Sequence, residues 1–437
     1  MTNDKCLVCK KTSNSSKVIK VHLSKYQEYS LNFCSECKSF YVGDTSTLSQ
    51  FSQYDVMDDL HARFYVEVGS GIDSMINFFE AFDNSVTTKN FVDIGCGFGF
   101  MVDYVRSTYS LKTKGYERSY YGRLGKKILG IDVESSYLDE NTRGEFDIVY
   151  SSEVIEHVED PSIFLKNIKR LISEKGYLII TTPNAKYLSV DSVFPKRAII
   201  SPGEHYVIFS KNALQGLLRE EGFKNIVVIE KNERLLCCAS LSSKVRITYQ
   251  KNTENIRKKY ISYLIKLSNS NNQFLANSSR FRLYKEYVNK GDYESADIIW
   301  DELNDYFVKK TDIRIPYIPI DKINKVNSFE EYVESFPSYF GVLCFYRVMH
   351  LVNTLNLGEQ RIGLFVNVLT ILKKEASLDP NLFGEAASLI DNAFFHIFHS
   401  TNHLLYENKD TLSLLPKEFL DRFSELEYFN QELINKN

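Results

Sequence analysis

The feature that most constrains this chain is a glycine-rich segment, FVDIGCGFGF, at residues 91–100. Apolar residues lead into Asp93, and Gly95, Gly97 and Gly99 then occupy every second position before apolar residues resume. This order predicts a buried strand, a tight turn and the start of an amphipathic helix. Because glycine accepts positive φ and carries no Cβ, a ligand could approach the backbone of this turn closely. The segment alone indicates only a nucleotide-like ligand, and its G-x-G-x-G spacing differs from the G-x-G-x-x-G of dinucleotide-binding folds.

Strands and helices alternate after this segment, which predicts an α/β fold with a parallel, doubly wound, Rossmann-like sheet over residues 91–245. Glu117 ends the second expected strand and Glu134 the third. A helix is expected over residues 158–176, with Gly176 at its end. The strands are expected at residues 91–95, 114–118, 130–134, 146–152 and 177–184, followed by a closing pair at 225–231 and 234–241. Such a sheet binds its ligands at the carboxyl ends of the strands.

Four cysteines near the start of the chain form two C-x2-C pairs, Cys6 with Cys9 and Cys34 with Cys37. Two strand-like runs lie between the pairs, so the spacing predicts a zinc ribbon over residues 1–42 with a closed, structural Zn²⁺ site. The alternative is four incidental cysteines. A ribbon could bind nucleic acid, protein or substrate, or could simply stabilise a unit too small to build its own core.

Two further regions complete the expected organisation. Residues 43–90 are interpreted as a helical linker with apolar stripes, in which the sequence selects no aromatic residue as a ligand contact. Residues 246–437 are interpreted as an α-helical C-terminal domain because long amphipathic patterns follow one another there. That domain could mediate homo-oligomerisation, dock a partner or cover the acceptor site.

The charge balance excludes some function classes. Lys and Arg number 53 against 56 Asp and Glu, a net charge of -3, which argues against a dedicated nucleic-acid binder. No apolar run is long enough to span a membrane, and the N-terminus has no secretory pattern. We therefore expect a cytoplasmic protein whose cysteines are thiols or metal ligands.

Several motifs together resemble class I S-adenosylmethionine (SAM)-dependent methyltransferases, in the subgroup that contains the ubiquinone-biosynthesis O-methyltransferases. The matching stretches are DIGCGFG, GYER, FDIVYSSEVIEHVEDP, LISEKGYLIITTPN and GEHYVIFSKNALQGLLREEGF. The preceding cysteine module resembles the one found on sugar and surface-glycan methyltransferases. The resemblance covers roughly residues 90–245, and residues 246–437 match no family that the motifs identify.

The resemblance implies a SAM site made of residues from three strand ends. Gly95, Gly97 and Gly99 would let the backbone pass close to the methionine and ribose parts, Asp93 would reach the ammonium group, and Glu117 would bind the ribose hydroxyls. Glu134 and Ser135 fall where the family contacts adenine. Glu117 and Glu134 could instead be solvent-exposed carboxylates at strand ends. This alternative is stronger for Glu134 than for Glu117.

Two histidines are candidates for the base that would deprotonate an acceptor hydroxyl. His157 lies in EVIEHV after the fourth strand, and His205 lies in GEHYVIF after the fifth. Either could act, since histidine titrates near neutral pH, and either could only shape the pocket or make a structural hydrogen bond. Glu156, beside His157, is interpreted as facing solvent.

The leading hypothesis is therefore an enzyme of polysaccharide biosynthesis that O-methylates a hydroxyl of a nucleotide sugar or cell-surface glycan. One alternative is an RNA methyltransferase with a zinc-bearing N-terminal module. Another is an inactive methyltransferase fold that serves as a binding or scaffold protein.

Overall fold

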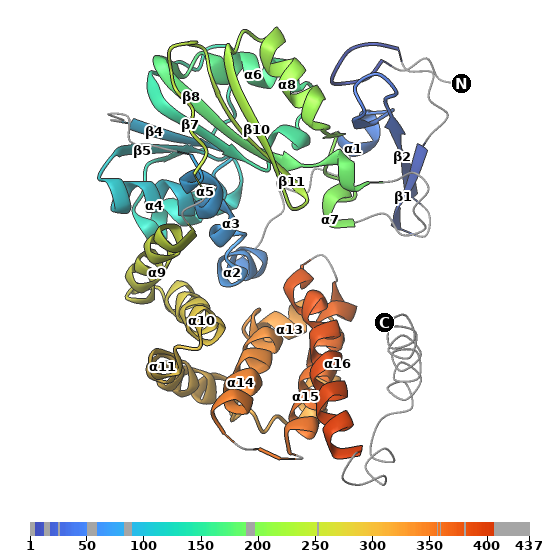
Figure 1. Ribbon diagram of the computed structural model, residues 1–437, viewed down its shortest axis with the longest axis vertical. Helices are drawn as coiled ribbons and strands as arrows, with labels where there is room; N and C mark the ends of the chain where they lie inside the picture. Colours follow the sequence, from blue (N-terminus) through green and yellow to red (C-terminus); the bar gives the residue numbers. More distant parts are fainter. Residues whose placement is uncertain are drawn as a thin grey trace, which may run out of the picture. The chain divides into compact units, whose positions relative to one another are not determined.

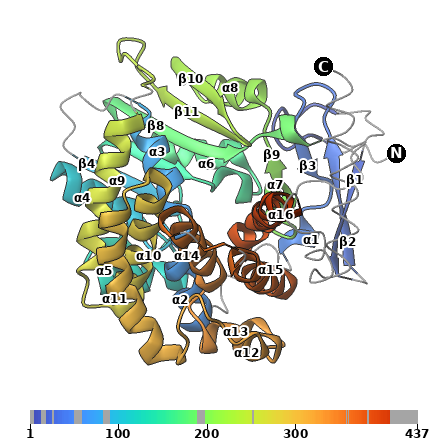
Figure 2. The same ribbon diagram turned by 60° about the horizontal axis from the view of Figure 1, so that its bottom comes forward.

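The computed structural model describes residues 5–12, 18–24, 27–49, 59–82, 90–188, 197–250, 253–355, 357–358, 360–379 and 382–405 (Figures 1 and 2). The chain forms two compact units, residues 1–266 and residues 267–437. The first unit holds both sheets, and the second is helical throughout its described elements. The finer four-part division expected from the sequence stays a prediction.

A seven-stranded sheet forms the centre of the first unit, in the order β10-β11-β8-β7-β4-β5-β6. Strands β4 to β8 pair in parallel, and β11 is antiparallel to both of its neighbours. The strands are β4 (Asn90–Ile94), β5 (Lys112–Tyr116), β6 (Val133–Glu134), β7 (Phe146–Ser152), β8 (Ile172–Pro183), β10 (Asn225–Lys231) and β11 (Arg234–Ser240). The expected Rossmann-like sheet and its closing pair of strands are confirmed.

Two strands differ most from their expected bounds, for local reasons. The third strand is only two residues long, because Gly130 ends the preceding helix in a left-handed conformation with φ 63°. The fifth strand starts at Ile172, so Gly176 lies inside it and does not end a helix. A Cβ on Gly176 would lie 2.8 Å from the carbonyl oxygen of Phe146, beside a register irregularity, and glycine is the residue that such a bulge tolerates.

Helices cover both faces of this sheet (Figures 1 and 2). One face carries α3 (Ile72–Glu80), α4 (Phe100–Tyr109) and α5 (Tyr120–Leu129), and the other carries α6 (Pro161–Lys169) and α8 (Lys211–Glu220). Helix α6 begins at Pro161, later than the expected residue 158, because the Asp160 side chain accepts hydrogen bonds from Ser162 N and Ile163 N and Pro161 occupies the first turn. The layers bury a continuous core that includes Val92, Val149, Leu165 and Leu214.

A second, four-stranded sheet contains the predicted ribbon hairpin. Its order is β1-β2-β3-β9, with β1 (Val18–Ser24), β2 (Gln27–Phe33) and β3 (Phe40–Val42) from the N-terminal region. The fourth strand, β9 (Val207–Ile208), comes from the segment after β8 and pairs Ile208 with Phe40. The ribbon and the methyltransferase-like region therefore share a sheet.

The region between the ribbon and β4 is helical where it is described. It holds α1 (Ser46–Ser49), α2 (Asp59–Val68) and α3, and residues 50–58 and 83–89 lie outside the described residues. Helix α9 (Thr253–Ser268) follows the sheet and contacts α4, since Tyr263 Oη donates a 3.0 Å hydrogen bond to Asp103 Oδ2 and Lys266 Nζ lies 2.6 Å from the same oxygen. These contacts join α9 to the first unit.

The second unit confirms the expected helical C-terminal region. Phe307, Phe336 and Phe340 stack at its centre, with ring centroids about 5 Å apart. Its helices are α10 (Gln273–Lys290), α11 (Tyr293–Thr311), α12 (Ile320–Asn324), α13 (Phe329–Ser335), α14 (Phe340–Thr354), α15 (Gln360–Leu378) and α16 (Gly384–Leu405). Among the described residues of the whole chain, no helix is both long and apolar enough to cross a membrane.

Candidate active site

The glycine loop after β4 forms the floor of the candidate site. Gly95, Gly97 and Gly99 all have positive φ (72°, 54° and 84°), so each takes a conformation that other residues rarely adopt. A Cβ on Gly95 would lie 2.6 Å from Val154 Cγ2, and one on Gly99 would lie 2.1 Å from Ile131 Cδ1. The loop therefore needs glycine both for its turn and for the close approach of neighbouring side chains.

Glu117 lies against this loop at the end of β5. Its Oε2 accepts a 3.0 Å hydrogen bond from Gly97 N, and its Oε1 accepts a 2.8 Å bond from Ser119 N. These backbone donors fix the carboxylate, which still has lone pairs for further donors such as ribose hydroxyls. The structure thus brings together the glycines and Glu117 as the sequence predicts, while the ribose role itself stays a prediction.

Asp93 is the second carboxylate of this floor and is only 4% exposed. Burial, together with the charge of Glu117, raises the pKa of Asp93 well above its ordinary value. A cationic group beside Asp93 would favour its ionised form. The position is therefore suited to the ammonium group that the resemblance assigns to it.

Glu134 and Ser135 are less suited to their predicted adenine contact. The Glu134 carboxylate lies 2.5 Å from Lys114 Nζ, and the hydrogen bond from this lysine lowers the pKa of Glu134. Ser135 is exposed at the end of β6. The backbone of this strand does reach the site, because Glu134 O accepts a 3.0 Å hydrogen bond from Glu117 N. The adenine role of both residues stays a prediction.

Tyr65 of α2 is a site residue that sequence reasoning did not select. A Cβ on Gly97 would lie 2.3 Å from Tyr65 Oη, so the phenol covers the glycine loop. Its ring stacks on Tyr121 with centroids 4.1 Å apart, and burial raises its pKa. The sequence offers Tyr65 only as one of several aromatic residues in apolar stripes, so no local signal distinguishes it.

The two candidate base residues lie together, with ring centroids 4.6 Å apart and an interplanar angle of 82°. His205 is 4% exposed, and its Nδ1 lies 2.8 Å from Ile199 O. Since a carbonyl oxygen can only accept, Nδ1 carries the proton and Nε2 is the basic atom of neutral His205. Burial lowers the pKa of both histidines, and the neighbouring His157 lowers that of His205 further.

Glu156 completes this cluster, so the interpretation that it faces solvent is wrong. Its side chain is 0% exposed, because the residue lies in the short 3-10 helix η2 (Ile155–His157), which packs under β8 and α6. Glu156 Oε2 accepts a 2.9 Å hydrogen bond from Thr182 Oγ1, and Oε1 lies 3.9 Å from His157 Nε2. Burial and the charge of Glu153 raise the pKa of Glu156 well above its ordinary value.

The histidine cluster adjoins the glycine loop through Val154, whose methyl groups contact Gly95. One donor atom from each of Glu156, His157 and His205 lies within 4.8 Å of the others. Two imidazoles and a carboxylate are common ligands of divalent transition metals. The cluster could therefore act as a proton acceptor alone or hold a cation.

The four predicted zinc ligands also lie together. The sulfurs of Cys6 and Cys37 are 3.7 Å apart, as are those of Cys9 and Cys34, and one sulfur from each of the four lies within 4.8 Å of the others. A tetrahedral thiolate site with zinc–sulfur bonds of about 2.3 Å has edges of about 3.8 Å. In each knuckle the fourth residue after the first cysteine, Lys10 or Lys38, has positive φ and donates its N–H to the carbonyl of that cysteine. The two knuckles therefore have matching turns and the donor set that Zn²⁺ prefers.

Comparison with known proteins identifies the central part of the chain. Residues 68–228 match the family described as "Methyltransferase domain". The ubiquinone biosynthesis O-methyltransferase of Bradyrhizobium diazoefficiens is 30% identical over 105 residues, which cover 22% of this chain and 41% of the relative. The tRNA U34 carboxymethyltransferase of Campylobacter jejuni is 24% identical over 161 residues, which cover 35% of this chain and 55% of the relative.

Solved structures also resemble part of the chain. A SAM-dependent methyltransferase from Thermotoga maritima, described as a possible histamine N-methyltransferase, is 17% identical and covers 42% of this chain and 94% of its own, with a TM-score of 0.34. The chain thus spans about 41% to 55% of the length of the two curated relatives. Together with the strand order and the glycine loop, the family match identifies residues 68–228 as a class I, Rossmann-like methyltransferase domain.

Proposed function

We propose that the protein is a SAM-dependent methyltransferase that O-methylates a hydroxyl group of a nucleotide sugar or cell-surface glycan. The observation that carries the proposal is that Val154 lies against Gly95 and that His157, three residues later in the chain, meets His205 edge to face. Methyl transfer to a hydroxyl requires a cofactor site with a proton acceptor nearby, and these residues could supply both.

The cofactor site is proposed to use the loop residues Gly95, Gly97 and Gly99 with Asp93 and Glu117. Bound SAM supplies a methyl carbon that is activated by a sulfonium and leaves a neutral thioether. Asp93 and Glu117 place two carboxylates at the loop, which favours a cationic ligand over an anionic one. Tyr65 covers Gly97 and would exclude water from this side of the loop.

His205 is proposed as the proton acceptor, with His157 in support. Its Nε2 is the basic atom, and the Ile199 carbonyl that accepts from Nδ1–H would stabilise the imidazolium that forms. Because burial lowers the pKa of both rings, both are neutral near pH 7 and His205 can accept a proton. One donor atom of Glu156 lies within 4.8 Å of one from each ring, so protonation of His205 would in turn favour the ionised form of this carboxyl.

A second interpretation of the same cluster is that Glu156, His157 and His205 hold a divalent cation. A cation there would lower the pKa of a coordinated hydroxyl and so replace the imidazole as the means of deprotonation. Turnover after treatment with EDTA and passage over a desalting column separates the two interpretations. Loss of the ribbon's zinc could lower activity by either route, but only the metal-dependent route regains activity with added Mn²⁺.

The N-terminal module is proposed to hold one structural Zn²⁺ on Cys6, Cys9, Cys34 and Cys37. Four thiolates would close the coordination shell, so the ion would fix the fold of the ribbon without taking part in methyl transfer. Ser210, which caps α8, donates its hydroxyl hydrogen to Cys37 O, and Ser210 N donates to Ser39 Oγ at 3.0 Å. Zinc would thus also stabilise the segment that follows His205.

The glycan acceptor rests on the resemblance of the cysteine module and on the near-neutral charge of the chain. The two relatives compared carry names of a ubiquinone-precursor and a tRNA enzyme, so RNA stays the first alternative acceptor and an inactive scaffold the second. Incubation of the protein with methyl-labelled SAM and separate pools of nucleotide sugars, glycans and RNA tests all three. The cytoplasmic location and homo-oligomerisation through the C-terminal helices stay predictions.

A further inference from the structure

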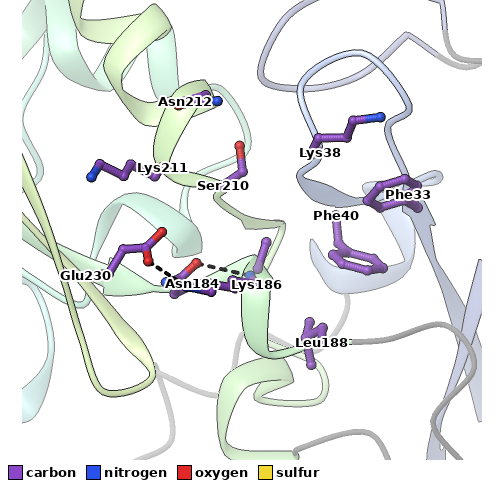
Figure 3. Close-up of a pocket in the computed structure, with 11 residues that line it drawn as sticks. Phe33, Lys38, Phe40, Asn184, Lys186, Leu188, Ser210, Lys211, Asn212 and Glu230 are labelled. Carbon is purple, nitrogen blue, oxygen red and sulfur yellow. Dashed lines mark hydrogen bonds and ion pairs between the residues drawn. The ribbon is translucent and has the colours of Figure 1, made fainter.

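A cleft of about 370 Å³ opens within the first unit, where the ribbon sheet meets the carboxyl end of β8 (Figure 3). Phe33, Lys38 and Phe40 line it from the ribbon. The exit of β8 and the first turn of α8 line it from the methyltransferase domain. None of the residues to which the sequence assigns catalysis, SAM or metal lines this cleft.

Asn184 lines this cleft, and among the described residues its side-chain Nδ2 donor has no protein partner. Its side chain is 1% exposed, and its Oδ1 accepts a 3.0 Å hydrogen bond from Lys186 N, which fixes the orientation of the amide. Among the described residues, Asn184 Nδ2 makes no hydrogen bond. A buried donor without a partner is costly, so the amide is suited to a ligand that brings an acceptor atom.

The charges around Asn184 favour a negatively charged hydrogen-bond acceptor. Lys38, Lys186 and Lys211 line the cleft together with a single carboxylate, Glu230, and that carboxylate is paired with Lys186 Nζ at 2.9 Å. Within the described part of the chain, Lys38 and Lys211 have no ion-pair partner. Lys211 also begins α8, whose N-terminus carries partial positive charge. The excess of two cations therefore stays available to a ligand.

The cleft lies within reach of the histidine cluster. Thr182, which donates to Glu156, and Asn184 are two residues apart on an extended segment, so their side chains share a face and lie about 7 Å apart along it. Asn184 also bridges Phe209, which lies four residues after His205 in the chain and so at most about 13 Å from it. A nucleotide sugar or glycan that spans this distance could therefore place an acidic group in the cleft while its hydroxyl faces the histidines.

We infer that this cleft binds the acidic group, a phosphate or a carboxylate, of a sugar acceptor whose hydroxyl faces the His157–His205 pair. The inference rests on the proposed function for the identity of the hydroxyl, but the anion site can be measured without methyl transfer. Asn184 Nδ2 donates to an anionic oxygen, and Lys38 and Lys211 neutralise its charge. The ribbon thus takes part in substrate recognition through Phe33 and Lys38.

The test is saturation-transfer NMR on the full-length, zinc-loaded protein with three probes: glucose 1-phosphate, glucuronate and neutral glucose. We expect the phosphate or the carboxylate probe to bind at least tenfold more tightly than glucose, and the preferred probe identifies the source of the anion. Asn184→Asp keeps the acceptor oxygen for Lys186 N but replaces the donor with a charge, so it should abolish this preference. Lys211→Ala should weaken binding at least fivefold, and Lys224→Ala, an exposed change at the other end of α8, should not.

Equal binding of all three probes, or variants that bind the charged probes as the unchanged protein does, would overturn the inference. A calorimetric SAM titration on Asn184→Asp and Lys211→Ala separates this failure from that of the proposed function. If SAM binds but the probes show no preference, only the anion cleft is wrong. If the probes bind as expected but no SAM binds, the methyltransferase proposal fails and the cleft stands.

Discussion

The imidazole rings of His157 and His205 meet edge to face, with centroids 4.6 Å apart. The first lies in η2 after β7, and the second lies just before β9, so the pair depends on the joint placement of two strand ends. The backbone fixes this placement, because Tyr206 N donates a 2.8 Å hydrogen bond to Glu156 O. A pair held in this way is suited to move one proton at a defined atom, Nε2 of His205.

Replacement of His205 tests its role as proton acceptor. We expect His205→Ala to lower kcat by about 10² to 10⁴, the usual contribution of a positioned general base, while the Kd for SAM stays within a factor of two. His157→Gln should lower kcat less, since it acts through His205. Steady-state kinetics measures kcat and calorimetry measures the Kd for SAM on the same preparations, so an effect on turnover is separated from an effect on cofactor binding. Full turnover in both variants would remove the histidines from the mechanism.

The pH dependence follows from the lowered histidine pKa values. Burial holds both folded-state values below the ordinary 6.5, so the base is free at pH 7 and turnover should stay level down to below pH 6.5. Below the folded-state pKa, kcat should fall tenfold per pH unit as His205 becomes protonated. Stability should fall too as pH drops through 6.5, since the unfolded chain then binds more protons than the folded one. A kcat that halves above pH 7 would contradict the assignment.

The carboxylate at the end of β5 is testable through cofactor affinity. Glu117→Gln keeps an acceptor for Gly97 N or Ser119 N but removes the charge, and we expect it to weaken SAM binding roughly tenfold, or about 1.4 kcal/mol. Glu140→Gln, an exposed carboxylate on the loop after β6, is the matched control and should leave the Kd unchanged. Isothermal titration calorimetry measures both. If both variants bind SAM with the same affinity, Glu117 only stabilises the glycine loop and does not bind the cofactor.

Removal of the metal tests the ribbon. We expect one zinc per chain, and Cys37→Ser or exhaustive chelation should lower the protein's melting temperature by about 5 °C or more, because the ion joins the two knuckles of a small sheet whose core is shared with the segment after β8. Cys344→Ala, a buried cysteine in α14 of the helical unit, should leave the zinc content at one. Elemental analysis measures the zinc content, and a thermal melt measures the melting temperature. Unchanged stability after complete loss of metal would refute a structural zinc site.

The sequence predicts the sheet well because its determinants are local. The apolar run before Asp93 and the alternate glycines specify a strand and a turn, and the C-x2-C spacing specifies two knuckles. The structure has the corresponding local geometry, in the positive φ of Gly95 and in the turns where Lys10 N and Lys38 N donate to the carbonyls of Cys6 and Cys34.

The tertiary contacts could not be predicted in the same way. Tyr65 reaches Gly97 from a helix outside the motifs that resemble methyltransferases. Glu156 is buried because η2 packs beneath β8. Strand β9 pairs with β3 of the ribbon although most of the first unit's sequence lies between them. No periodicity in the sequence predicts this pairing. The Asn184 cleft likewise depends on that shared sheet, since its lysines come from both parts.

The central claim, that this chain transfers a methyl group from SAM, is tested most directly by one radiochemical measurement. The full-length protein is incubated with methyl-labelled SAM and fractionated nucleotide sugars, glycans and RNA, alongside Glu117→Gln and His205→Ala. We expect label in a sugar-containing fraction that depends on His205 and is reduced in Glu117→Gln. Label in RNA alone would contradict the glycan acceptor, and no label in any fraction, with no SAM binding by calorimetry, would contradict the enzyme itself.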